Sequence, residues 1–150
     1  MIAVFDNEYA FLSNFYDSPF ELDDVTYPTV EHFFQAMKAA DPKERKVIAA
    51  AITPGQAKRL GRKVVLRADW EDIKVDVMRF ALRCKFQIPE LREKLLATGN
   101  EELIEGNWWH DNTWGDCMCS ECQNKPGRNM LGMLLMEIRS DIRYEESHKE

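Results

Sequence analysis

The sequence contains no apolar run that approaches the roughly 20 residues a helix needs to cross a bilayer. Its apolar start, Met1 to Phe5, is cut short by Asp6, Asn7 and Glu8, so it does not resemble a signal peptide. These absences predict a cytoplasmic protein that does not interact with membranes.

Positive charge is not in excess. The chain carries 20 Lys and Arg against 26 Asp and Glu, a formal net charge of −6 at pH 7. Because non-specific affinity for phosphate backbones comes from clustered Lys and Arg, this balance argues against a general nucleic-acid binder. A local basic pocket is still allowed.

Cysteine is scarce, and its spacing is not that of a secreted disulfide framework. Three of the four cysteines, Cys117, Cys119 and Cys122, lie close together, with His110 nearby. In a reducing compartment such residues remain thiols or bind metal. Two thiolates separated by two residues can share a zinc ion, but the tight Cys-x-Cys spacing is a less usual addition. Free thiols and a zinc site are both left open.

The chain does have enough apolar material for one core, since 45% of its 150 residues are hydrophobic and 11% are aromatic. It shows neither an internal repeat nor a linker. We expect a compact, mainly α-helical single domain over residues 1–150, with a core over about 11–142 and a frayed, charged tail at 145–150.

Capping residues and apolar periodicity place the elements. The expected N-caps are Thr29, Asp41, Thr53 and Asp69. Helices are predicted at residues 30–38, 43–52, 55–60, 70–87, 89–97 and 129–143, of which 70–87 is the longest. A few short N-terminal strands are expected at 2–5 and in a hairpin over 20–27 that turns at Asp23-Asp24.

Residues 27–38, YPTVEHFFQAMK, open a helix with a carboxylate in its first turn. Glu31, Gln35 and Lys38 are spaced by four and three residues, so they share one face, and the other faces carry Phe33, Phe34 and Met37. A buried unpaired carboxylate is costly, so this polar stripe must either satisfy itself or line a pocket. Glu31 is therefore the leading candidate for chemistry.

An aromatic segment precedes this helix and contains Phe11, Ser13, Asn14 and Phe15. Aromatic rings beside small hydrogen-bonding groups suit a planar heterocycle, although packing beneath a loop is the alternative. Farther along, Arg62, Lys63 and Arg67 form a basic cluster. It is either a solvated surface or a site for a phosphorylated ligand.

A second chemical stretch lies at residues 107–116, an irregular segment that holds three of the four tryptophans. Trp108, Trp109 or Trp114 could stack on a base or sugar. Asp111 and Asp116 supply carboxylates that could meet Glu31 across a cleft. The alternative is a buried loop whose aspartates make local turn hydrogen bonds. Both interpretations stay open.

Eight motifs in order resemble the YbiA-like family, also called the NADAR superfamily. They are FLSNF at 11–15, YPTVEHFFQAMK at 27–38, AKRLGR at 57–62, RADWEDIKVDVM at 67–78, KF at 85–86, LLATG at 95–99, DNTWGD at 111–116 and NMLGMLLMEIR at 129–139. After Asp116, the run CMCSECQNKPGRN departs from the short glycine-rich run of the better-known bacterial pattern.

The resemblance implies a mainly helical hydrolase of N-glycosidic bonds in ribose-linked substrates. Some members cleave ribosylamino-pyrimidine phosphates of riboflavin biosynthesis, and others remove ADP-ribose from guanine in nucleic acid. The family's glutamate in its EH motif falls on Glu31, its DW tryptophan on Trp70, and its loop residues on Asp111 and Trp114.

These inferences combine into one hypothesis for the site. Glu31 and Asp111 are expected to be catalytic, Glu31 near the anomeric carbon and Asp111 as a second acid/base or water-positioning group. The helix dipole favours the charged form of Glu31, which suits a base or cation-stabilising role better than an acid role, whereas burial acts in the opposite direction, and the sequence leaves this balance open. The expected substrate-binding residues are Phe11, Ser13, Asn14, Phe15, Gln35, Lys38, Arg62, Arg67, Trp70, Trp114 and Asp116. Neither a metal nor another cofactor is needed for this chemistry.

Three functions remain distinguishable. The first is hydrolysis of a phosphorylated ribosylamino-pyrimidine or a related nucleotide-like small molecule. The second is removal of ADP-ribose from guanine in nucleic acid. The third is a non-catalytic ADP-ribose or nucleotide sensor, against which the two carboxylates argue, because an anion binder gains nothing from carboxylates near phosphate.

Overall fold

The computed structural model describes residues 1–149 and is mainly helical, with a few short strands, as the sequence predicts. The chain divides into two compact units. The central unit comprises Asn14–Ile88, and the terminal unit comprises Met1–Ser13 together with the chain from Pro89 onward. A single domain over 1–150 stays a prediction.

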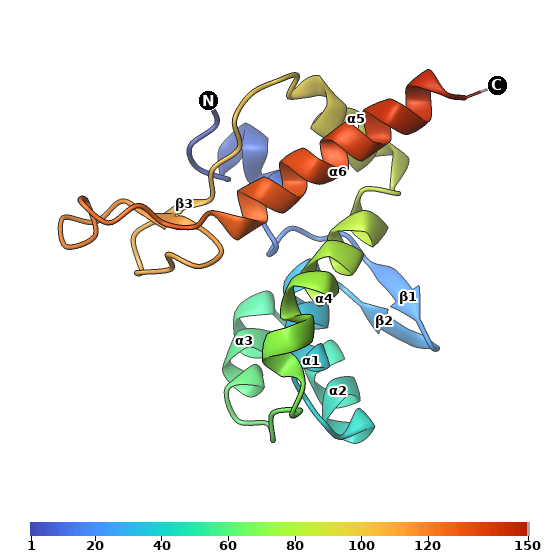
Figure 1. The fold of residues 1–150 in the computed structure, drawn as a ribbon. Helices are drawn as coiled ribbons and strands as arrows, with labels where there is room; N and C mark the ends of the chain where they lie inside the picture. Colours follow the sequence, from blue (N-terminus) through green and yellow to red (C-terminus); the bar gives the residue numbers. More distant parts are fainter. Residues whose placement is uncertain (150) are drawn as a thin grey trace. The chain divides into compact units, whose positions relative to one another are not determined.

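Helix α1 (Val30–Met37) lies in the middle of the central unit. It contacts α2 (Pro42–Ala49), α3 (Pro54–Gly61), α4 (Trp70–Lys85) and strand β2 (Val25–Tyr27), as Figure 1 shows. Seven of its eight residues are buried, which explains why the sequence places aromatic side chains around it. Its polar residues are therefore held by neighbours on several sides.

The predicted hairpin is confirmed. Strand β1 (Phe20–Leu22) pairs antiparallel with β2, and Asp23 and Asp24 have φ angles of 52° and 64°. Two successive left-handed residues give the turn type that matches the twist of paired strands. The rings of Phe20, Tyr27 and Phe33 lie 5.0 to 5.7 Å apart and join the hairpin to α1.

Three of the four predicted N-caps are confirmed, because Thr29, Asp41 and Thr53 accept hydrogen bonds from backbone N–H groups of their helices. Asp69 does not cap α4 with its side chain. Its carboxylate instead lies 2.7 Å from the guanidinium of Arg67, which outcompetes the backbone as a partner.

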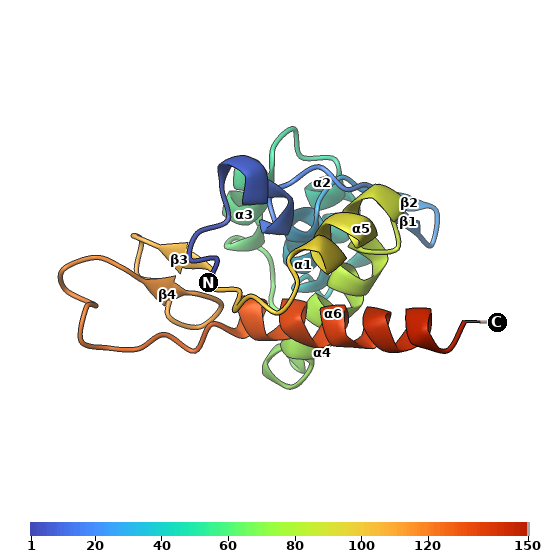
Figure 2. The ribbon, with the colours of Figure 1, turned by 90° about the horizontal axis from the view of Figure 1, so that it is seen from above.

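The terminal unit contains a 3-10 helix (Asn7–Leu12), α5 (Pro89–Ala97) and α6 (Met130–Ser147). Helices α5 and α6 are in contact, and both views of the ribbon show them side by side (Figures 1 and 2). Strands β3 (Gly106–Asn107) and β4 (Asp116–Cys117) pair in parallel, so strands are not confined to the N-terminal part. The predicted strand at 2–5 is wrong, since Ile2 makes only an isolated bridge with Leu103.

Helix α6 reaches Ser147, so the expectation of a frayed tail is wrong for residues 145–147. Arg92 of α5 explains the extension, because its guanidinium lies 3.2 Å from Glu145 and 2.9 Å from Glu146. At 18 residues α6 is also longer than α4, which has 16. Residue 150 lies outside the described residues. Within residues 1–149, the helices fall short of the length and apolar character needed to span a membrane.

Candidate active site

Glu31 occupies the second position of α1, where the sequence predicts it. Its backbone N–H donates to the carbonyl oxygen of Asn14 at 3.1 Å, which ties the segment before the hairpin to the first turn of the helix. Its carboxylate Oε1 accepts a 2.8 Å hydrogen bond from Nε2 of Gln35, one turn later. The polar stripe thus satisfies itself in part, although Glu31 is only 7% exposed.

Burial raises the pKa of the Glu31 carboxyl above its ordinary value. The hydrogen bond from Gln35 and the positive charges of Lys58 and Lys38 act in the opposite direction but do not cancel the effect of burial. The sequence left the balance between the helix dipole and burial open, and in the structure burial is the largest influence on this pKa. A raised pKa brings a glutamate closer to the range in which it exchanges protons at neutral pH.

Cationic side chains gather around this carboxylate. Burial lowers the pKa of Lys38, the negative charge of Glu31 raises it, and the positive charges of Lys58, Arg62 and Lys74 lower it further. Lys58 and Lys74 are not among the site residues expected from the sequence. The signal for Lys58 is its spacing of four residues from Arg62, which puts both on one face of α3.

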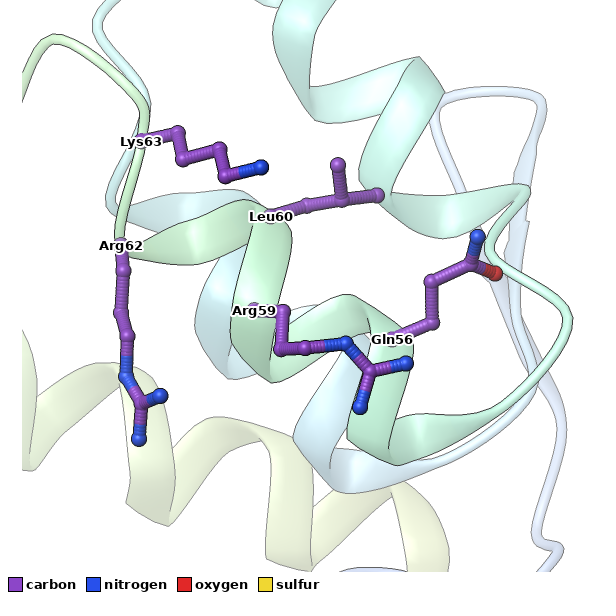
Figure 3. A pocket seen from close by; sticks show the side chains of 5 residues that line it. All are labelled: Gln56, Arg59, Leu60, Arg62 and Lys63. Carbon is purple, nitrogen blue, oxygen red and sulfur yellow. The ribbon is translucent and has the colours of Figure 1, made fainter.

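Arg62 also lines an open hollow of about 420 Å³ along α3, together with Gln56, Arg59, Leu60 and Lys63. Figure 3 shows the ammonium end of Lys63 lying along Leu60, whereas the guanidinium of Arg62 points away from it. The hollow therefore presents three cationic side chains. Arg67, the other predicted phosphate contact, is already paired with Asp69 and donates to the carbonyl oxygen of Met37 at 3.5 Å.

Three buried oxygen atoms in the central unit have no hydrogen-bond partner among the described residues. Besides Oε2 of Glu44, two of them belong to residues that contact Glu31. One is Oε1 of Gln35 and the other is Oδ1 of Asn14. Buried carbonyl oxygens are almost always hydrogen-bonded, so these two acceptors call for an external donor such as a hydroxyl group or water.

The side chain of Gln35 is fixed by a close backbone approach. A Cβ at Gly61 would lie 2.1 Å from Oε1 of Gln35 and 3.0 Å from its Cδ, so only glycine leaves room for the amide. This contact is the reason that α1 and α3 can approach each other beside the polar stripe. It also holds the amide against Glu31.

His32, next to Glu31, is buried and fully engaged. Its Nδ1 lies 2.8 Å from the hydroxyl of Thr29, and its Nε2 lies 2.9 Å from the carbonyl oxygen of Ala51. Its backbone N–H donates to the same Thr29 oxygen at 3.1 Å. His32 therefore ties the start of α1 to the segment that follows α2.

The predicted aromatic residues occupy different environments. Trp70 is only 5% exposed and packs edge-on against Phe34, with ring centroids 5.0 Å apart. Phe11 is buried in the terminal unit beneath the ammonium group of Lys94, whereas Phe15 is 48% exposed in the central unit. Packing thus explains the buried positions of Trp70 and Phe11. A role in stacking on substrate stays a prediction for Trp70, Phe11 and Phe15.

The FLSNF motif is shared between the units. Phe11 and Ser13 belong to the terminal unit, and Asn14 and Phe15 belong to the central unit. Ser13 is half-buried and has a partner of its own.

The loop that carries Asp111 is organised by the buried side chain of Asn107. Its amide nitrogen donates to the carbonyl oxygen of Asp111 at 2.8 Å, and its amide oxygen accepts from the N–H groups of Trp109 and Asp111. Oδ1 of Asp111 accepts from the backbone N–H groups of Thr113 and Trp114. This carboxylate therefore has a local turn role, which was the alternative to a catalytic one.

Asp116 has a similar role, because its Oδ1 accepts from the N–H of Gly127 at 2.9 Å. Asp111, Trp114 and Asp116 lie in the terminal unit, and Glu31, Gln35, Lys38, Arg62, Arg67 and Trp70 lie in the central unit. In the central set, Gln35 and Lys38 interact with Glu31 and Arg62 with Lys38, whereas Arg67 pairs with Asp69 and Trp70 packs on Phe34.

Four potential metal ligands also gather in the terminal unit. They are His110, Cys117, Cys119 and Cys122, whose ligand atoms all lie within 4.8 Å of one another. The sequence left this cluster open between free thiols and zinc.

Comparisons with known proteins agree with this description. Residues 3–143 match the NADAR domain family. The N-glycosidase YbiA of Escherichia coli (strain K12) is 43% identical over 143 residues, which cover 93% of this chain and 86% of that protein. The Riboflavin biosynthesis protein VVA0006 of Vibrio vulnificus (strain YJ016) is 39% identical over 140 residues, which cover 91% of this chain and 36% of that longer protein.

A solved structure is similar as well. The NMR structure of the E. coli protein YbiA matches with a TM-score of 0.83 and 39% identity, over 100% of this chain and 91% of that chain. The likeness confirms the expected fold class.

Proposed function

The chain belongs to the NADAR domain family, and from this premise we propose that it is an N-glycosidase that hydrolyses the ribose C1–N bond of a phosphorylated ribosylamino-pyrimidine or a related nucleotide-like compound. The names of its relatives, an N-glycosidase and a riboflavin biosynthesis protein, support the reaction and the substrate class. The observation that carries the proposal is Glu31, a buried carboxyl with a raised pKa among cationic side chains.

Glu31 acts at the bond that breaks. Cleavage of a ribose C1–N bond passes through a transition state with positive charge on the sugar, while the departing nitrogen gains electron density. A carboxyl with a raised pKa can donate its proton to that nitrogen as the bond breaks. Water then adds to C1, and the proton that water releases restores the carboxyl. The hydrogen bond that the Gln35 amide donates keeps Oε1 of Glu31 oriented during both steps.

Neighbouring groups of the central unit suit the rest of the substrate. Oε1 of Gln35 and Oδ1 of Asn14 are fully buried acceptors without a partner among the described residues, and an ordered water between them and a ribose hydroxyl would satisfy them. Lys38, Lys58 and Arg62 supply positive charge for a phosphate group. Asp111 is proposed as a second acid/base or water-positioning group through the oxygen that its turn does not use.

The test is direct incubation with a substrate of each class. Purified protein is mixed with a ribosylamino-pyrimidine phosphate, and released base and ribose phosphate are measured by mass spectrometry. Glu31→Gln is run beside it as the matched inactive variant. Release by the wild-type chain and not by Glu31→Gln is expected, and equal release by both would reject the assignment of Glu31.

A second arm uses an oligonucleotide that carries ADP-ribosylated guanine. Release of ADP-ribose there, without turnover of the small molecule, would replace the proposed substrate by the nucleic-acid one. Binding of either compound without any release would leave only the non-catalytic sensor.

A further inference from the structure

We propose that His110, Cys117, Cys119 and Cys122 bind one Zn²⁺ ion, through Nδ1 of the histidine and the Sγ atoms of three thiolates. The proposal concerns the loop between β3 and α6 and does not depend on the proposed activity. It rests on the geometry of four donor atoms, on the groups around them and on the loop that they close.

The donor atoms have the spacing of a tetrahedral zinc site. Zinc bonds of about 2.3 Å to sulfur and about 2.0 Å to nitrogen place the ligand atoms of a tetrahedron roughly 3.5 to 3.8 Å apart. Nδ1 of His110 lies 3.4 Å from Sγ of Cys122, 3.5 Å from Sγ of Cys119 and 3.9 Å from Sγ of Cys117. All four donors lie within 4.8 Å of one another, so a small contraction completes the tetrahedron.

The groups around the cluster have the positions that support a metal. Nε2 of His110, the ring nitrogen that does not face the sulfur atoms, lies 3.9 Å from a carboxylate oxygen of Glu121, so a small side-chain movement would bring the two to hydrogen-bond distance. Histidine ligands of metals commonly donate their second N–H to such a group, which fixes the ring orientation. The backbone N–H of His110 donates to Sγ of Cys117 at 3.3 Å, which stabilises a thiolate there.

The backbone conformation of His110 also favours the cluster. His110 has a φ of 66°, a left-handed conformation that is uncommon for a residue other than glycine and that persists only where its surroundings impose it. This conformation is compatible with both contacts at once, the N–H to Cys117 and the ring nitrogen to all three sulfur atoms. Three sulfur donors and one nitrogen donor form one of the sets that structural zinc sites use.

Protons and charge balance when zinc binds. Each of the three thiols releases a proton to solvent, the imidazole stays neutral with its proton on Nε2, and the ion adds two positive charges to three negative ones. Four protein ligands leave no open position for substrate or water, so the ion is structural and not catalytic.

The ion would hold the loop that carries Asp111. His110 is its direct neighbour, and Cys117 donates its N–H to Oδ1 of Asn112 at 2.8 Å. The carbonyl oxygens of Asn112 and Trp114 in turn accept from Arg128 and Leu131 at the start of α6. Zinc therefore cross-links residues 110–122 to a segment that is already anchored on a helix.

The experiment measures metal in the full chain, purified under reducing conditions without chelator. We expect about one zinc per chain in the wild type and in the control Cys84→Ser, whose cysteine lies on α4 in the other unit. Cys119→Ser should weaken zinc binding by more than the roughly 10–100-fold that changes to outer-shell partners cause. Circular dichroism on each variant shows whether the helices persist.

A second readout protects the test against misfolding of Cys119→Ser. Cobalt added to the metal-free wild-type chain should give the intense absorption of a tetrahedral thiolate complex. The proposal is overturned if the wild-type chain neither retains zinc nor binds added zinc or cobalt. It is equally overturned if folded Cys119→Ser keeps wild-type affinity, if iron is the bound metal, or if two of these cysteines form a disulfide in the reduced protein.

Discussion

Gln35 donates an amide hydrogen to Glu31 across one turn of α1, at 2.8 Å, while its own amide oxygen is buried without a partner among the described residues. Gln35 therefore orients the carboxyl that we propose as catalytic, while its own amide oxygen is packed against Gly61. The first predictions follow from this pair.

Replacement of Glu31 by Gln should reduce turnover by at least about a hundredfold, the lower end of what acid–base groups contribute, because the amide cannot transfer a proton. Steady-state kinetics on the ribosylamino-pyrimidine phosphate would measure it. Glu71→Gln, at an exposed glutamate paired with Lys74 on α4, is the matched control and should keep wild-type activity. A folded Glu31→Gln variant with undiminished turnover would contradict the role.

The stability of the same variant should differ from the wild type in a pH-dependent way. The folded state raises the pKa of Glu31, so it binds the proton more tightly than the unfolded chain does. This contribution to the free energy of unfolding is complete below the ordinary glutamate value of about 4.3. It is lost as pH rises through the folded pKa.

Glu31→Gln is neutral throughout, so its stability relative to the wild type should increase over that window. Denaturant titrations at a series of pH values would show the divergence. If the free energies of unfolding of the two proteins change with pH in parallel, burial does not penalise the charged form of Glu31.

Gly61→Ala should destabilise the chain, because the new Cβ would meet the side chain of Gln35. Overpacking of this kind costs about 1–3 kcal/mol, and displacement of the amide should also lower turnover. Gly55→Ala in the same helix is the control. Its Cβ would meet nothing closer than 3.9 Å, so its stability should be unchanged or higher by up to about 1 kcal/mol. Similar unfolding midpoints for the two variants would disprove the contact.

Lys85 gives a pH dependence of the opposite sign. Its side chain is fully buried near the rings of Tyr16 and Phe86, and burial lowers its pKa from 10.5 to about 7. Between these two values the unfolded chain binds the proton and the folded chain does not, so stability should rise with pH across this window.

Lys85→Met removes the titrating group, so the free energy of unfolding should no longer rise with pH over this window. Any contact that the substitution removes should shift the free energy of unfolding by the same amount at every pH. Thermal unfolding of both proteins between pH 7 and pH 10.5 would test it. A wild-type slope that survives in the variant would assign the effect to another group.

Removal of zinc should make the loop between β3 and α6 open to solvent more often. In hydrogen exchange measured by mass spectrometry, peptides from residues 107–128 should exchange faster after chelation, while peptides from α1 should be unaffected. Re-addition of zinc should restore protection, because the four ligands are brought back together. Equal exchange with and without metal would remove the structural role, even if zinc binds.

Local features of the fold were predictable from the sequence. The hairpin at Asp23-Asp24 and the caps at Thr29, Asp41 and Thr53 depend on neighbours within a few residues, and all are confirmed. Asp69 failed as a cap because a guanidinium two residues away competed for it. The tail of α6 was misjudged because its partner, Arg92, is distant in the sequence.

The site was predictable only in its outline. Helical spacing identified the stripe of Glu31, Gln35 and Lys38, but not the contributions of other elements. Helical spacing groups Lys58 with Arg62, but it does not show that the charge of Lys58 acts on Glu31. The close approach of Gly61 is a tertiary contact that no local pattern encodes. The same is true of the Glu31 pKa, which depends on burial and not on helix position alone.

The hydrogen bonds of His32 bear on the path of the proton that we propose Glu31 exchanges. The carbonyl oxygen of Ala51 can only accept, so Nε2 carries a ring hydrogen in that contact, and Nδ1 lies against the hydroxyl of Thr29. A carbonyl oxygen does not take up the Nε2 proton, so the ring has no group at Ala51 to which a proton could be passed on, although it adjoins Glu31 in the chain. The proposed acid would therefore exchange its proton with the substrate or with water and not through His32.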